Sequence, residues 1–257
     1  MGTSTWHRSP ATQEWGRVRE LYAQPNPDPR EVVRRIVAAL DPETVERMKA
    51  PAVVTCLSVL VEGSRRVAEH GLTNTLAGLG VETEPPVPQL AAGLRNRAGQ
   101  LIAQEEYASR FGDLAMDAVG TTAMALATLD DSGSSLLDIP LAVAEANFAG
   151  FDRDGRLPEL AATFLRHDLD HAFRHFIARD MSDFVGGEGI PTVGHASRFE
   201  DAASRYCRDG LETLDLQRWS DALAESPSLS VPERVQVLTP AISGGIDAAI
   251  VALGGVA

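Results

Sequence analysis

Helix-start signals recur along this chain, and they constrain its fold more than any other feature. Asp28-Pro29-Arg30-Glu31 places an N-cap aspartate before a proline at the first helical position, with an acidic residue in the first turn. Asp41-Pro42-Glu43 repeats this signal. Between the two starts, apolar side chains recur at helical spacing: Val32, Val33, Ile36, Val37 and Leu40. Alternating runs of β-branched residues are nearly absent, so the sequence predicts an all-α fold.

The predicted architecture is a non-repetitive multi-helix bundle with two less regular ends. Residues 1–27 are expected to form an irregular N-terminal arm with one short helix around 14–22. Residues 28–257 are expected to form one helical domain, with a candidate sub-boundary at the glycine- and proline-rich connector 77–89. Before this connector a long apolar helix is expected from Pro51 to about His70, and after it a helical block from about residue 89 to 129. The C-terminus is expected to be a Gly-rich tail because it holds Gly244-Gly245 and Gly254-Gly255.

The composition is that of a folded protein with an acidic surface. Hydrophobic residues make up 44% of the 257 residues and charged residues 23%, with a formal net charge of −13. Such a surface repels phosphate, so direct electrostatic binding to nucleic acid is not expected. About half of the net charge lies in residues 101–150, where Arg110 is the only basic residue. That segment is either a solvated helix face or a docking surface for a basic partner or a cation.

Nothing in the sequence indicates export, a membrane span or a disulfide framework. The N-terminus has neither a charged region nor an apolar region of the kind that signal peptides use. The apolar stretches look too short to cross a bilayer. Cys56 and Cys207 are the only cysteines and are far apart. We therefore expect a cytoplasmic protein without membrane contact. Lys49 is the only lysine, an arginine bias typical of GC-rich bacterial genomes.

Three histidines form the strongest chemical signal in the chain. His167, His171 and His175 follow the spacing i, i+4, i+8, so they share one helix face beside Asp168. Two histidines at i, i+4 can chelate one metal, so a divalent metal is the candidate cofactor. The main apolar stripe of the same helix should lie on another side: Ala161, Leu165, Leu169, Ala172 and Phe176. The face is interpreted as a metal site, an acid–base or anion-binding site, or a structural surface.

Two classes of metal enzyme are compatible with this helix. Carboxylates from neighbouring helices would complete a di-metal site like that of helical oxidases, with these candidates: Glu62, Glu69, Asp113, Asp117 and Glu145. Arg66-Val67-Ala68-Glu69-His70 and Leu165-Arg166-His167-Asp168 resemble the two early motifs of HD-domain phosphohydrolases. The resemblance implies that His70, His167 and Asp168 hold divalent metals that activate water on a phosphate ester. It also implies a later aspartate ligand, with Asp201 and Asp221 among the candidates.

Two tryptophans in the predicted arm are candidate contacts with another protein. Trp6 and Trp15 lie in a segment expected to be poorly structured, where an exposed indole lowers solubility. Either they fold back onto the body of the protein, or they anchor the arm on a partner.

Three hypotheses about function follow. The first is a non-catalytic helical accessory subunit of a bacterial multi-protein system, with a protein partner or a second copy of the chain, in a defence or stress operon. The opening Met1-Gly2-Thr3-Ser4, with the helical make-up, resembles QatB-type accessory proteins. The second is a metal-dependent hydrolase or oxidase that uses the histidine helix. The third is a helical protein that binds a small ligand in an apolar pocket.

Overall fold

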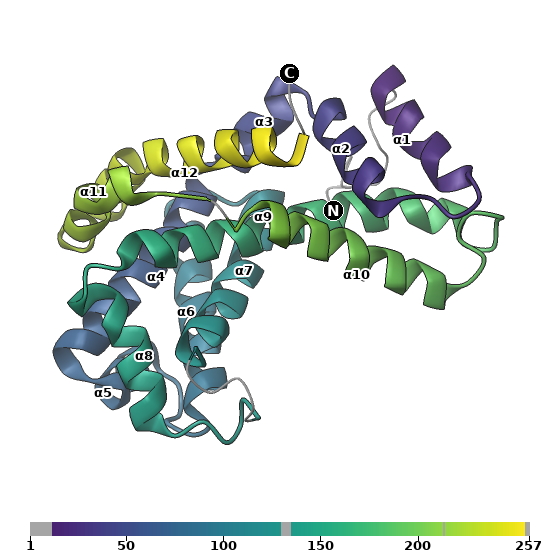
Figure 1. The fold of residues 1–257 in the computed structure, drawn as a ribbon. Helices are drawn as coiled ribbons and strands as arrows, with labels where there is room; N and C mark the ends of the chain where they lie inside the picture. The colour runs from purple at the N-terminus through teal and green to yellow at the C-terminus, as the bar shows by residue number, and fades with distance from the viewer. Residues whose placement is uncertain (1–11, 130–134, 213, 255–257) are drawn as a thin grey trace. The chain divides into compact units, whose positions relative to one another are not determined.

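The all-α prediction is confirmed (Figure 1). The computed structural model describes residues 12–129, 135–212 and 214–254. Within those ranges the regular structure is helical, and the one β-type contact is an isolated bridge between Val185 and Ile190. The α-helices have these bounds: α1 Gln13–Ala23, α2 Pro29–Ala39, α3 Pro42–Met48, α4 Pro51–His70, α5 Leu72–Leu79, α6 Pro86–Gln104, α7 Arg110–Ala127, α8 Leu141–Arg153, α9 Leu157–Met181, α10 Val193–Gly210, α11 Ser220–Glu225 and α12 Val231–Gly254.

The helices divide between two compact units, each built from separate segments of the chain. Unit 1 comprises Met1–Val45, Leu169–Thr213 and Asp247–Ala257. Unit 2 comprises Glu46–Asp168 and Leu214–Ile246. The division therefore falls inside three helices, the short α3 and the long α9 and α12. The connector 77–89, which was the candidate sub-boundary, lies wholly within unit 2.

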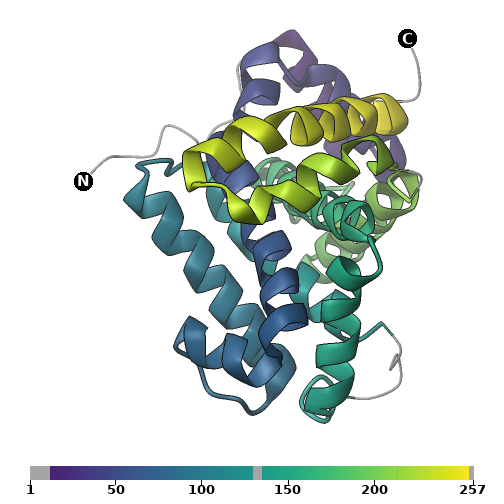
Figure 2. The same cartoon turned by 90° about the vertical axis from the view of Figure 1, so that its left-hand side faces the viewer.

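Unit 2 is organised around α4, which packs against α5, α6, α7 and α8. Figure 2 shows α4 lying between α6 and α8. Most of the α4 side chains are buried, and two small residues let neighbouring helices approach closely. A Cβ added to Gly63 would lie 2.8 Å from Leu94 Cδ2, and Ser64 donates a hydrogen bond of 2.8 Å to the Phe148 carbonyl oxygen. Packing of small residues thus fixes α6 and α8 on either side of α4.

Unit 1 joins the first two helices to α10. The helix α2 packs against both α1 and α10, and its N-terminus has the predicted Asp28 cap, which accepts a hydrogen bond from the Arg30 amide at 3.0 Å. Tyr22 from α1 is fully buried, with its ring 5.8 Å from that of Phe199 on α10. The loop before α10 approaches α1 closely, because Gly189 contacts the Tyr22 and Gln24 carbonyl oxygens.

Replacement of Gly189 by alanine should destabilise unit 1 by about 1–3 kcal/mol, the usual cost of overpacking. A Cβ at this position would lie 2.5 Å from the Gln24 carbonyl oxygen and closer still to that of Tyr22. Both are backbone atoms, so no side-chain rotation relieves the clash. Chemical denaturation should show the loss. Gly16→Ala is the matched control, because no atom lies within 4 Å of its added Cβ. Equal stability of the two variants would contradict the placement of the loop.

Several predicted boundaries need correction. Residues 89–129 were expected to form one helical block, but the chain leaves the helix at Glu105 and begins α7 at the N-cap Ser109. Glu106 has a φ of 57°, which a non-glycine residue rarely adopts, so no glycine or proline marks this break. The arm also contains a helix from residue 13, as expected, whereas its first eleven residues lie outside the described ranges.

The expected Gly-rich tail is helical as far as Gly254. Gly244 and Gly245 lie inside α12, where the absence of side chains allows close packing within unit 2. A Cβ at Gly245 would clash with Leu165 of α9, and one at Gly244 would lie 3.6 Å from the Trp219 ring. At these two positions glycine allows neighbouring helices to pack closely, and it does not end the helix. Gly255 lies outside the described residues.

The helix α12 also changes the expectation about membrane spans. Within the described ranges it is the one helix long and apolar enough to cross a bilayer by length and composition. The expectation that all apolar stretches are too short is therefore wrong for this helix. Its charged residues Glu233 and Arg234 cluster in the first turns, and only Asp247 follows. A core helix of a soluble protein passes the same test, so this finding is weak evidence for membrane contact.

Candidate functional site

The three histidines of α9 lie at the edge of the buried surface. His167, His171 and His175 are half-buried, whereas Leu165 and Leu169 are fully buried. The apolar surface of α9 is wider than one stripe, because Phe164 and Phe173 are also buried. The imidazoles therefore lie on a partly covered strip of α9, where the Nε2 atom of His175 is buried.

Asp168, which lies between the histidines, is buried without a hydrogen-bond partner among the described residues. Only 5% of it is exposed, and burial raises its pKa to about 8. Its carboxyl group is therefore mostly protonated at neutral pH. Asp170 is equally buried, at 6% exposed, but accepts a 2.5 Å hydrogen bond from Ser204. It also lies 3.4 Å from Arg174 and 3.6 Å from Arg208.

The described residues bring no metal-binding cluster together. Nowhere within them do three or more histidine, cysteine, aspartate or glutamate side chains meet so that they could hold one ion. His70 lies at the exposed C-terminal end of α4, with Nε2 3.7 Å from Glu69 Oε2. Asp168 by contrast is buried, so the HD-type set of ligands is not assembled.

The other candidate ligands have their own places in the structure. Asp117 pairs with Arg95, and Glu145 accepts a 2.7 Å hydrogen bond from the Leu72 amide at the start of α5. The candidate later aspartates are exposed: Asp201 in α10 and Asp221 in α11. Asp113 lies 3.8 Å from Arg110 in the first turn of α7.

Trp15 belongs to the core of unit 1. It is 2% exposed, its ring lies 5.9 Å from that of Phe176, and the Arg179 guanidinium lies 4.8 Å over it. A buried indole in a cation–π contact stabilises the fold and cannot reach a partner while α1 stays packed. Trp6, the other candidate anchor, lies outside the described residues.

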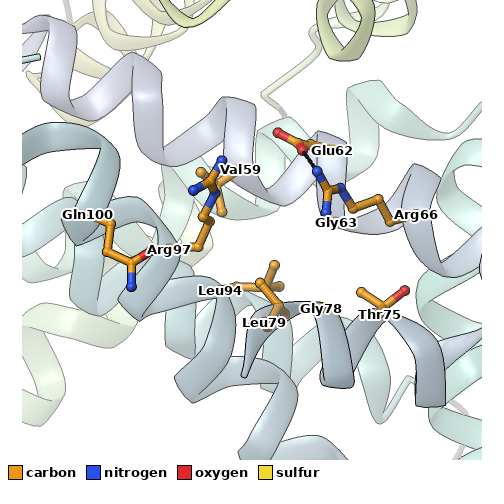
Figure 3. Close-up of a pocket in the computed structure, with 10 residues that line it drawn as sticks. All are labelled: Val59, Glu62, Gly63, Arg66, Thr75, Gly78, Leu79, Leu94, Arg97 and Gln100. Carbon is orange, nitrogen blue, oxygen red and sulfur yellow. Dashed lines mark ion pairs between the residues drawn. The ribbon is translucent and has the colours of Figure 1, made fainter. Parts of the chain in front are cut away.

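A hollow of about 230 Å³ in unit 2 is the best-defined candidate site (Figure 3). Three helices line it, each with residues at helical spacing that share a face. The lining residues are Val59, Glu62, Gly63 and Arg66 of α4, Thr75, Gly78 and Leu79 of α5, and Leu94, Arg97 and Gln100 of α6. An adjoining hollow shares Arg66, Thr75 and Gly78 and extends to His70. The sequence-predicted His70 therefore lies at the rim of this site.

No known family model, curated protein or solved structure matches this chain. What the protein does must therefore follow from the chemistry of its own residues.

An ion-pair chain holds one wall of the hollow. Glu62 accepts one hydrogen bond from Arg234 and lies 2.6 Å from Arg66 Nη2. Burial alone would raise the pKa of Glu62, but the hydrogen bonds and positive charges of Arg234 and Arg66 outweigh it and lower that pKa. Arg234 also donates to two backbone carbonyl oxygens, those of Leu229 at 2.8 Å and Pro227 at 3.0 Å. Each of the three guanidinium nitrogens of Arg234 thus donates a hydrogen bond, whereas Arg66 is half-exposed and retains further N–H groups.

The opposite wall carries a second arginine. Among the described residues no carboxylate pairs with Arg97, which is half-buried on α6. Figure 3 shows the Arg97 and Arg66 side chains reaching toward the hollow from opposite sides, above Leu79 and Leu94. The hollow therefore combines an apolar floor with an excess of positive charge in an otherwise acidic protein.

A different surface of unit 2 exposes leucines. Leu129, Leu136 and Leu137 in the connector between α7 and α8 are 49%, 41% and 65% exposed. They are half of the large hydrophobic side chains that are exposed among the described residues. Asp138 follows them and is also exposed. Leu136 and Leu137 are consecutive in the chain and both exposed, so they differ from the isolated exposed leucines that any surface carries.

Sequence reasoning missed Arg97, Gln100 and the leucine grouping. Arg66 was considered only as part of the motif that contains His70. No local sequence pattern relates Arg66 to an arginine on another helix. The helical spacing of Leu94, Arg97 and Gln100 shows that they share a face of α6, but only packing shows what that face covers.

Proposed function

We propose that this protein is a non-catalytic helical subunit that binds a protein partner within a bacterial multi-protein system, such as a defence or stress operon. The observation that carries the proposal is the exposed leucine group Leu129, Leu136 and Leu137 beside an acidic segment. Exposure of leucine side chains to water costs free energy, and their burial against a partner would recover it.

The charge of the surroundings indicates the chemistry of the partner. Residues 101–150 carry eight acidic residues and one basic residue, Arg110, which lies 3.8 Å from Asp113. The exposed Asp138, which directly follows Leu136 and Leu137, would therefore attract a basic surface. The expected partner presents apolar side chains surrounded by lysine or arginine.

Substitution of Leu136 and Leu137 by serine should weaken the complex at least about tenfold, because burial of a leucine side chain contributes about 1.5–3 kcal/mol and a tenfold change corresponds to about 1.4 kcal/mol. The test is co-purification from the native host, followed by binding measurements between the purified partners. Stability should not change, since both side chains are exposed. Val193→Ser in unit 1, where valine is 76% exposed, is the control for general loss of apolar surface.

The proposal also predicts that higher salt weakens the complex, because screened charges attract a basic partner less. A partner that binds the double leucine variant and the wild type equally well would contradict the assignment of this surface. A chain that purifies without any stoichiometric partner would contradict the function itself.

The remaining parts of the proposal concern location and other ligands. We propose a cytoplasmic protein that binds neither nucleic acid nor membranes. The net charge of −13 supports the exclusion of nucleic acid. For membranes the relevant helix is α12, whose fixation in unit 2 through Gly244 and Gly245 supports a role in the protein core.

A further inference from the structure

We propose that the hollow between α4, α5 and α6 binds a small organic carboxylate, held by Arg97 and Arg66 and packed on Leu79 and Leu94. This site is formed by residues other than the leucine group. It would therefore be a second binding site on this chain, in addition to the surface proposed for the protein partner.

The charges in the hollow favour an anion. Of the three charged residues that line it, two are arginines, and the single carboxylate of Glu62 already has Arg234 as a partner. Arg66 uses its Nη2 atom for Glu62, and Arg97 has no carboxylate partner among the described residues. A guanidinium group forms paired hydrogen bonds with a carboxylate, and such charge-assisted bonds are the strongest in proteins. Gln100 and Thr75 supply further polar groups at the same hollow.

The hollow is kept open at a position where a side chain would fit. Gly78 lies within α5 and lines both hollows, yet no atom lies within 4 Å of a Cβ added to it. Alanine would favour the helix by roughly 1 kcal/mol over glycine, so local stability does not explain glycine here. In contrast, the nearby Gly63 and Gly93 are in tight contact with leucine side chains. Gly78 is exposed, so a larger side chain at this position would narrow the opening of the hollow to solvent and to a ligand.

The size and lining of the hollow limit the ligand. A volume of about 230 Å³ has room for about eight water-sized groups. By itself it is smaller than the pockets of roughly 300–1,000 Å³ that take drug-sized ligands, and the adjoining hollow of about 500 Å³ is more open to solvent. Val59, Leu79 and Leu94 provide the apolar part of the lining. A carboxylate on a short aliphatic or aromatic body, close to benzoate in size, matches this combination.

The test measures binding of benzoate and butyrate to the full chain by ligand-observed NMR and calorimetry. We expect a Kd on the order of 1 mM or tighter for at least one of them, as ligands of this size allow. Benzamide, which has the same shape without the charge, should bind at least about tenfold more weakly. Arg97→Gln should weaken carboxylate binding by a similar factor, and Arg97→Lys, which keeps the charge but loses the paired geometry, should weaken it less.

Two further variants separate binding from folding. Gly78→Leu should fill the hollow and abolish binding, while the far-ultraviolet circular dichroism and the Tm stay at or above those of the wild type. Arg95→Gln is the matched control, because Arg95 lies on the same helix but pairs with Asp117 outside the hollow. It should leave binding unchanged.

Three results would overturn the proposal. One is the absence of binding by either carboxylate at concentrations up to about ten times the expected Kd. Another is equal loss of binding in the Arg95 and Arg97 variants, which would show general attraction to surface charge. The third is benzamide binding as strong as benzoate binding. None of these results depends on Leu136 or Leu137, so the partner-binding proposal can fail or hold separately.

Discussion

Asp168→Asn should make the protein more stable, and the gain should grow with pH. The carboxyl group of Asp168 is buried without a hydrogen-bond partner among the described residues, and burial raises its pKa to about 8 from the ordinary 3.8. Between these values the unfolded state releases a proton that the folded state retains, so folding becomes less favourable as pH rises. Asparagine does not titrate in this pH range, so the variant lacks this loss of stability with rising pH. Its folding equilibrium constant relative to the wild type should rise about tenfold per pH unit from about pH 4 to pH 8.

Urea denaturation of both proteins at a series of pH values measures this effect. The two should have similar stability well below the ordinary aspartate pKa of 3.8, where the Asp168 carboxyl is neutral in both the folded and the unfolded state. Asp170→Asn is the matched contrast, because Asp170 is equally buried but has Ser204, Arg174 and Arg208 as partners. Removal of its charge should destabilise the protein. Parallel pH curves for wild type and Asp168→Asn would show that Asp168 is solvated or paired.

Arg234→Met should destabilise unit 2 by about 3–5 kcal/mol, the cost of breaking a buried ion pair by removing one partner. The Arg234 and Glu62 side chains are only 10% and 14% exposed. Methionine also leaves the carbonyl oxygens of Leu229 and Pro227 without their donors. The pKa of Glu62 is lowered in the folded protein, so the pair stabilises the fold above the ordinary glutamate pKa of 4.5 and less at lower pH.

Denaturation at pH 7 and below pH 4.5 should therefore show a larger difference between Arg234→Met and the wild type at pH 7. Arg95→Met is the control on a solvent-exposed pair, since Arg95 and Asp117 are 52% and 49% exposed. It should cost less than about 1 kcal/mol. An effect of Arg234→Met as small as that of the control would mean that Glu62 is satisfied by Arg66 alone.

Where local chemistry decides a helix boundary, sequence reasoning located it well. Pro51 begins α4 and His70 ends it, as predicted, because proline favours the first helical position and Gly71 with a φ of 80° follows the last. The break between α6 and α7 was missed because it depends on a non-glycine residue, Glu106, with a positive φ. Gly244-Gly245 was misread because helix packing, which a single sequence does not display, requires small residues there.

The candidate site was far less predictable than the fold. The histidines of α9 form a conspicuous local pattern, yet the described residues gather no metal-binding set around them. The arginines of the hollow carry no local pattern, because Arg66 and Arg97 come from different helices that only tertiary packing brings together. The same limit applies to Asp168, whose burial depends on how completely its neighbours cover α9.

The discontinuous make-up of unit 1 has a consequence for the order of events during protein synthesis. Its second helix, α2, leaves the ribosome early, but the packing of α2 and α10 also involves the last turn of α12. Gly254 lies against Val37, and the Leu253 carbonyl oxygen accepts a hydrogen bond from Tyr206 at 3.4 Å. Co-translational folding of this unit therefore cannot finish until residue 254 has been translated. Until then α1 and α2 expose apolar faces that a nascent-chain chaperone can bind.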